Sequence, residues 1–108
     1  MRWEKLPDPP FPICSHSVGA FVSNDTGNTT LCFFGGWNGS DTVFDCFLLY
    51  DVKKQEWTIS KRHDISLRRR FAHSCSMSEK SDDMFLFGGV TDSPAEDLSE
   101  LVQVSMEP

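Results

Sequence analysis

The stretch Phe33-Phe34-Gly35-Gly36, followed by Phe47-Leu48-Leu49-Tyr50-Asp51 and then by Trp57, decides the fold of this chain. An apolar run that ends in a glycine doublet predicts a β-strand leading into a tight turn, because glycine adopts positive φ angles without strain. A neighbouring backbone can also approach closely where no side chain stands. The pattern therefore indicates short strands joined by turns.

The same pattern occurs twice. Gly35-Gly36 recurs as Gly88-Gly89, 53 residues later, and Trp57 lies 54 residues after Trp3. A repeat near fifty residues that is built from short apolar runs indicates stacked all-β units, and such units need neighbours to bury their apolar faces.

The repeated unit resembles the kelch repeat, in which four antiparallel strands form one blade of a β-propeller. The resemblance rests on the strands that end in glycine doublets, on Trp57, and on Arg70-Phe71-Ala72-His73-Ser74, which matches the start of a kelch blade. It implies an all-β fold of about two four-stranded blades, with kelch repeat 1 at residues 14–61 and an incomplete kelch repeat 2 at residues 70–108. Tryptophan at position 57 is expected to fill the gap between adjacent blades. The residues expected to be structural are Trp3, Gly35, Gly36, Tyr50, Trp57, Gly88 and Gly89.

Seven strands follow from the two copies. The expected ranges are 15–23, 30–35, 44–52 and 56–60 in the first copy, and 71–78, 84–88 and 98–105 in the second. The fourth strand of the second copy would fall near position 111. Residues 1–7, with Trp3 aligned to Trp57, are instead expected to be the outer strand of a split blade.

Two blades cannot close a ring, because propellers contain about four to eight blades. Completion can come from further copies in a head-to-tail homo-oligomer, from another propeller chain, or from the rest of a longer protein. A fragment or a partner-completed piece is favoured over the homo-oligomer, since propellers are mostly single chains.

Charge and hydropathy exclude several classes of protein. The net charge of −6 argues against nucleic-acid binding, which depends on neutralising phosphates. No apolar run approaches the roughly 18 residues of a membrane span. We expect no nucleic-acid partner and no membrane contact. Without a signal segment, a cytoplasmic or nuclear location is favoured over secretion, despite sequons at Asn24, Asn28 and Asn38.

One loop face is the candidate binding surface. In an antiparallel meander, the turn between the second and third strands emerges at the same edge as the connection between repeats, where arginines cluster. The candidate partner-binding residues are Trp37, Asn38, Ser40, Asp41, Arg62, Arg68, Arg69 and Arg70. Arginine forks bind carboxylates, so the partner is a protein and its contact an acidic peptide. Alternatively, these arginines are solvated or pair with the acidic second unit of a neighbouring copy.

Catalytic and metal-binding patterns are missing from the sequence. His16 and His73 are repeat equivalents, and His63 has no carboxylate or cysteine at a telling spacing. The four cysteines fit buried free thiols better than a metal site or disulfides; they are Cys14, Cys32, Cys46 and Cys75. We expect no catalytic residue, no metal and no cofactor.

The predicted function is a non-enzymatic protein-interaction module. The alternatives are a fragment of a propeller enzyme of the oxidase or sialidase type, and the substrate-receptor part of a ubiquitin ligase.

Overall fold

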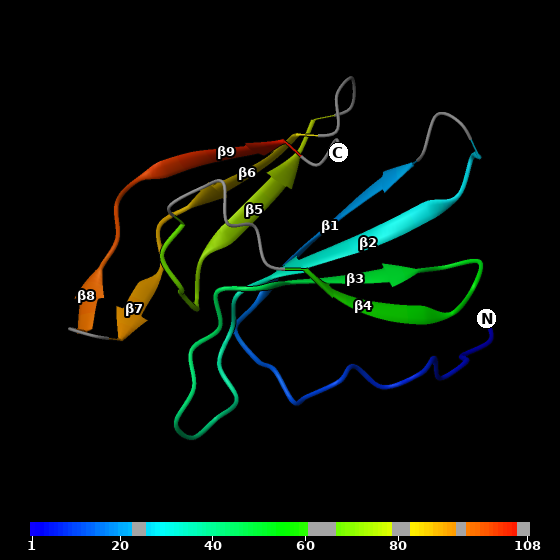
Figure 1. The fold of residues 1–108 in the computed structure, drawn as a ribbon, viewed down its shortest axis with the longest axis horizontal. Coiled ribbons are helices and arrows are strands. Elements are labelled where there is room, and N and C mark those ends of the chain that lie inside the picture. The colour runs from blue at the N-terminus through cyan, green and yellow to red at the C-terminus, as the bar shows by residue number, and fades with distance from the viewer. Residues whose placement is uncertain (23–25, 61–66, 79–82, 93–94, 106–108) are drawn as a thin grey trace.

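The computed structural model describes residues 1–22, 26–60, 67–78, 83–92 and 95–105, and every regular element in these ranges is a β-strand. The first sheet is antiparallel and has its four strands in chain order (Figure 1). These strands are β1 (Ser17–Val22), β2 (Thr29–Phe34), β3 (Phe47–Asp51) and β4 (Glu56–Ser60). The prediction of an all-β, antiparallel fold is therefore confirmed.

The second sheet has three antiparallel strands, with β6 in the centre. They are β5 (Ser74–Met77), β6 (Asp83–Phe87) and β9 (Leu101–Ser105). A short hairpin of β7 (Val90–Asp92) and β8 (Ala95–Asp97) leaves this sheet between β6 and β9. The seven expected strands are present: β4 has the expected range, β2 and β6 are shifted by one residue, and the other four are shorter than expected. The β7–β8 hairpin was not predicted.

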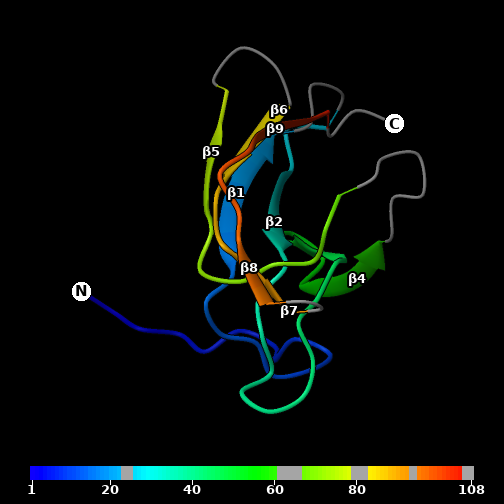
Figure 2. The ribbon, with the colours of Figure 1, turned by 90° about the vertical axis from the view of Figure 1, so that its left-hand side faces the viewer.

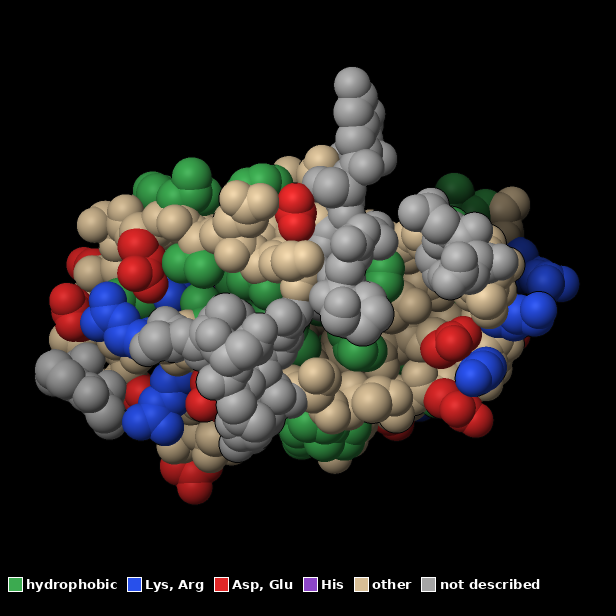
Figure 3. Space-filling model, turned by 45° about the horizontal axis from the view of Figure 1, so that its top comes forward, with side chains coloured by type: hydrophobic (Ala, Val, Ile, Leu, Met, Phe, Trp, Pro, Cys, Tyr) green, Lys and Arg blue, Asp and Glu red, His purple; other side chains and the backbone are tan. Residues whose placement is uncertain are grey.

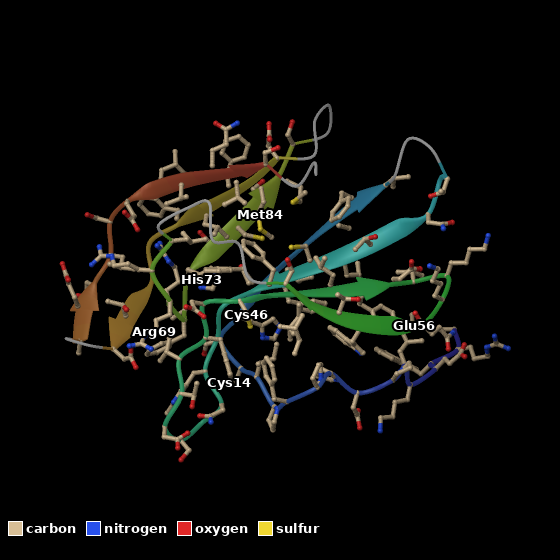
Figure 4. The ribbon with its side chains drawn as sticks, viewed as in Figure 1. Cys14, Cys46, Glu56, Arg69, His73 and Met84 are labelled. Carbon is tan, nitrogen blue, oxygen red and sulfur yellow. The ribbon has the colours of Figure 1, made fainter. Side chains whose placement is uncertain are left out.

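The two sheets pack face to face, and β1 and β5 are the strands through which they meet (Figure 2). Alternate residues of each strand point into this interface. The core consists of Cys32, Phe34 and Phe47 from the first sheet and Met84, Leu86 and Val104 from the second. Figure 4 shows Met84 between the sheets.

Trp57 lies on the opposite face of the first sheet. Trp57 of β4 is the cross-strand partner of Tyr50 of β3, so the two side chains lie on the same face of the sheet. Its ring contacts Tyr50 and Phe33 at centroid distances of 4.9 and 5.2 Å, and its Nε1 donates to Pro7 O at 2.9 Å. Trp57 therefore does not fill the gap between the two sheets of this chain, because strand alternation turns it away from that gap.

The expected outer strand of a split blade at residues 1–7 is not formed within a single copy, and it stays a prediction. These residues form no strand, and the Trp3 side chain is 89% exposed. The N-terminal segment meets β4 at Pro7, whose carbonyl oxygen accepts a hydrogen bond from Trp57 Nε1, and it lies below the first sheet in Figure 1, whereas β9 lies above that sheet. A strand requires a hydrogen-bonded neighbour, so the structural role expected for Trp3 in a split blade also stays a prediction.

The sequence repeat is also a repeat of backbone geometry. Residues Ser15 and Ala72 both have positive φ, at 54° and 56°. Cys14 exchanges two backbone hydrogen bonds with Trp37, as Phe71 does with Val90, all between 2.8 and 3.0 Å. The four glycines of the two doublets all have positive φ, from 67° to 98°. The β7–β8 hairpin is thus the counterpart of the loop between β2 and β3.

Candidate functional site

The loop between β2 and β3 lies next to the β7–β8 hairpin at one end of the molecule (Figure 1). Between them is an open pocket of about 260 Å³. The rings of Trp37 and Phe71 lie side by side, with centroids 5.8 Å apart. The pocket is lined by Trp37, Ser40, Asp41, Val43, Phe71, Val90, Thr91, Asp92 and Ala95. Three of the residues expected on this face, Trp37, Ser40 and Asp41, therefore meet at one pocket.

Asn38 holds the β2–β3 loop in shape. Its Oδ1 accepts hydrogen bonds from the backbone N–H groups of Ser40 and Thr42 at 2.9 and 3.1 Å. Its Nδ2 donates to Asp41 Oδ1 at 2.9 Å. This bond, followed by that from the Thr42 hydroxyl, lowers the pKa of Asp41, because hydrogen bonds to the carboxylate favour its charged form. Asn38 therefore positions the loop, and Asp41 presents a negative charge to the pocket.

The arginines on this face are paired with carboxylates of the second repeat. Arg68 Nη1 lies 3.2 Å from Glu96 Oε2, and Arg69 Nε lies 2.9 Å from Asp92 Oδ1. Figure 3 shows basic and acidic side chains intermixed at the left-hand end of the molecule, and Figure 4 shows Arg69 beside β7. Both arginines are about half exposed, so each pair contributes little to stability.

Arg70 differs from the expectation for a binding residue, because it is fully buried. Its guanidinium donates to the carbonyl oxygens of Gly88 and Arg68 at 3.2 and 3.1 Å, and to Glu100 Oε1 at 2.6 Å. Its charge and donors are thus used inside the fold, and it joins the start of the second repeat to the glycine doublet of that repeat. Arg62 lies outside the described residues.

The glycine doublets stand where two segments cross. A Cβ on Gly36 would lie 3.0 Å from Cys14 O and 3.0 Å from His16 Cβ. A Cβ on Gly89 would lie 2.8 Å from Phe71 O and 2.9 Å from His73 Cβ. Each second glycine therefore admits the backbone that precedes the first strand of its own repeat, as the sequence predicted in general terms.

His73 links the two sheets. Its Nε2 is 2.6 Å from Ser17 Oγ in a buried hydrogen bond. Burial, and next the charge of Arg70, lower its pKa to about 4, so the ring is neutral near pH 7. His16 instead packs beside Phe33, with centroids 5.6 Å apart. The described part of the chain contains no group of three or more His, Cys, Asp or Glu side chains placed to hold a metal ion, and His63 lies outside it.

None of the four cysteines forms a disulfide, and their burial differs from the expectation. Cys32 and Cys46 are buried, Cys75 is half-buried and Cys14 is exposed. Burial, with a smaller effect of Cys75, raises the pKa of the Cys32 thiol to about 12. Cys32 therefore serves as an apolar core residue.

Sequence reasoning missed six of the residues that line the pocket, namely Val43, Phe71, Val90, Thr91, Asp92 and Ala95. One signal was available, since Val90 follows Trp37 by the 53 residues that separate the glycine doublets.

Among the described residues, no helix is long and apolar enough to span a membrane. No protein-family model matches the chain, and a search of curated proteins finds no similar sequence.

Proposed function

We propose that this chain forms kelch-type propeller blades and acts as a non-enzymatic protein-interaction module. The proposal takes the first sheet as one complete blade and the second as a blade without its outer strand. Its support is the repeated geometry of the two glycine doublets and of the backbone pairs that flank them.

The observation that carries the binding proposal is the open pocket beside the Trp37 and Phe71 rings. Tryptophan and other aromatic residues are enriched at the energetic centres of protein interfaces. A volume of about 260 Å³ is below the roughly 300–1,000 Å³ of pockets that hold drug-sized ligands. It suits one side chain of a partner protein.

The charges around the pocket favour a basic side chain in that position. Asp41 lines the pocket, and its hydrogen bonds stabilise its charged form, whereas the charge of Asp92 is already paired with Arg69. The described arginines of the cluster already have carboxylate partners in the chain. An acidic peptide would have to displace those partners, whereas a lysine or arginine could place its apolar stem against Trp37 and its charge near Asp41.

Selection of random twelve-residue peptides on the immobilised chain tests this proposal. Peptides recovered on the native chain should lose at least tenfold in affinity on Trp37→Ala, and they should keep their affinity on Val52→Ala. Val52 is a suitable control because it is exposed and lies in the turn after β3. Equal binding to native chain and Trp37→Ala would refute the loop-face site.

The composition of the recovered peptides tests the choice of charge. We expect enrichment in lysine or arginine, and weaker binding to Asp41→Asn. Enrichment in aspartate or glutamate, with binding lost in Arg68→Ala or Arg69→Ala, would instead support the acidic-peptide interpretation.

A further inference from the structure

Each sheet has one face that the other sheet covers and one face that points away from it. In the first sheet, Phe34 and Phe47 are cross-strand partners on the covered face, and they are 0% and 2% exposed. Their repeat equivalents in the second sheet are Phe87 and Leu101, which are also cross-strand partners. These two side chains are 52% and 68% exposed. The same positions are therefore buried in one repeat and open in the other.

The opposite faces show the complementary relation. Cys75 of β5 packs against the core between the sheets, and its repeat equivalent is Val18 of β1. Strand alternation places Val18 on the face of the first sheet that points away from the second, because neighbouring Gly19 faces Met77. On that face Val18 and Ile59 of β4 are 48% and 50% exposed, whereas Leu48 and Tyr50 of β3 are 2% and 1% exposed. The face that covers the core in the second sheet is thus partly open in the first.

An open strand edge accompanies the open faces. In the first sheet, β3 is paired with β4. In the second sheet, β9 takes the place of β3, and among the described residues no strand pairs with its outer side. An unpaired edge is a template for another strand. Residues 2–6 of the chain form no strand and carry the exposed Trp3, which is equivalent in sequence to Trp57 of β4.

We propose that the open face of the second sheet binds the open face of the first sheet of another copy, with residues 2–6 of that copy added to β9. This contact repeats between chains the packing that already joins the two sheets within one chain. The occupant is a second copy because the same sequence carries both halves of the contact and the spare strand. The association is heterologous, so it closes into a ring if the rotation between copies permits.

The test uses one aspartate substitution on each face. Phe87→Asp disables the face of the second sheet, and Val18→Asp disables that of the first. Both side chains are about half exposed, as is that of the control Val52→Asp, which lies in the turn outside both faces. The mass in solution is measured by light scattering after size exclusion, from micromolar concentration to about 100 μM.

The native chain and Val52→Asp should form species of at least twice 12.2 kDa, and Phe87→Asp and Val18→Asp should each be monomers. An equimolar mixture of the two monomeric variants should give a dimer, because each supplies the face that the other lacks. A folded monomeric native chain would overturn the proposal. So would a mixture that stays monomeric, or assembly that survives both substitutions.

Hydrogen exchange of the mixture tests the strand addition separately. In the mixture, amides of β9 in the Val18→Asp copy and of residues 2–6 in the Phe87→Asp copy should exchange at least tenfold more slowly than in either variant alone, and the same segments of the opposite copies should not change. Unchanged exchange in a mixture that does dimerise would overturn the strand addition. The proposal is independent of the loop-face pocket, so Trp37→Ala should assemble like the native chain.

Discussion

Gly35→Ala is the substitution that most directly tests how the two repeats pack. Gly35 has a φ of +67°, and a Cβ there would collide with the carbonyl oxygen of Arg70 and lie 3.0 Å from His73 Cε1. That carbonyl oxygen accepts a hydrogen bond of 2.8 Å from Gly36 N. The added methyl group would therefore have to displace the backbone at the start of the second repeat.

The expected loss of stability has two parts. An L-residue in the left-handed region costs about 1 kcal/mol. Overpacking against a backbone that cannot yield adds about 2 kcal/mol. Gly27→Ala is the matched control, since Gly27 has a φ of +72° and its Cβ would meet no atom within 4 Å. We expect losses of about 3 kcal/mol for Gly35→Ala and about 1 kcal/mol for Gly27→Ala.

Urea unfolding followed by tryptophan fluorescence measures both losses. The two variants and the native chain are compared at one protein concentration, because association would add to the stability of the folded state. Losses that agree within about 0.5 kcal/mol would show that position 35 needs glycine only for its backbone angle. The close approach of the Arg70 backbone would then have no energetic consequence, and the packing argument would be refuted.

Three further predictions concern residues of the sheets and the loop face. Trp57→Ala should lower the free energy of unfolding in urea by about 2 kcal/mol, because this ring is only half-buried. A fully buried aromatic typically costs about 3–5 kcal/mol, so a loss above about 4 kcal/mol would contradict the half-buried placement. Arg70→Ala should lower the free energy of unfolding by about 3 kcal/mol, because it leaves buried groups unpaired. Arg69 is half exposed, so Arg69→Ala should lower it by under about 1 kcal/mol. Equal melting temperatures for the two variants would exclude the structural role of Arg70. His73 has a pKa of about 4 when folded and about 6.5 when unfolded, so the unfolded chain binds more protons between these values and stability should fall by on the order of 2 kcal/mol as pH decreases from 6.5 to 4. Urea titrations of native chain and His73→Gln across that range check this, and an equally steep loss in the variant would assign the pH dependence to other groups.

The strands of this fold could be predicted because their signals are local. Apolar runs and the glycine doublets mark β2 and β6, and alternation along those runs identifies the face that packs. The β7–β8 hairpin was missed because its strands have three residues each and all three residues of β8 are exposed. Hydrophobic patterning carries little signal in such short strands. Comparison of Val90 with Trp37 across the repeat would have located the hairpin.

The loop face could be predicted only in part. The position of Trp37, Ser40 and Asp41 at one pocket follows from the order of strands in a meander. The pocket itself also needs Phe71 and the β7–β8 hairpin, which come from the second repeat. A sequence pattern within one repeat contains no information on which loop of the other repeat lies opposite.

The sequence alone determined that this chain is all-β, where its main strands lie and where glycine must interrupt them, because those properties depend on backbone freedom and side-chain alternation over a few residues. Only the tertiary structure decided which charges and faces are free. Arg70 is buried beside Glu100, 30 residues away, and Arg68 pairs with Glu96, 28 residues away. Burial and ion pairing depend on which distant segments the packed sheets bring together, and no local pattern specifies that.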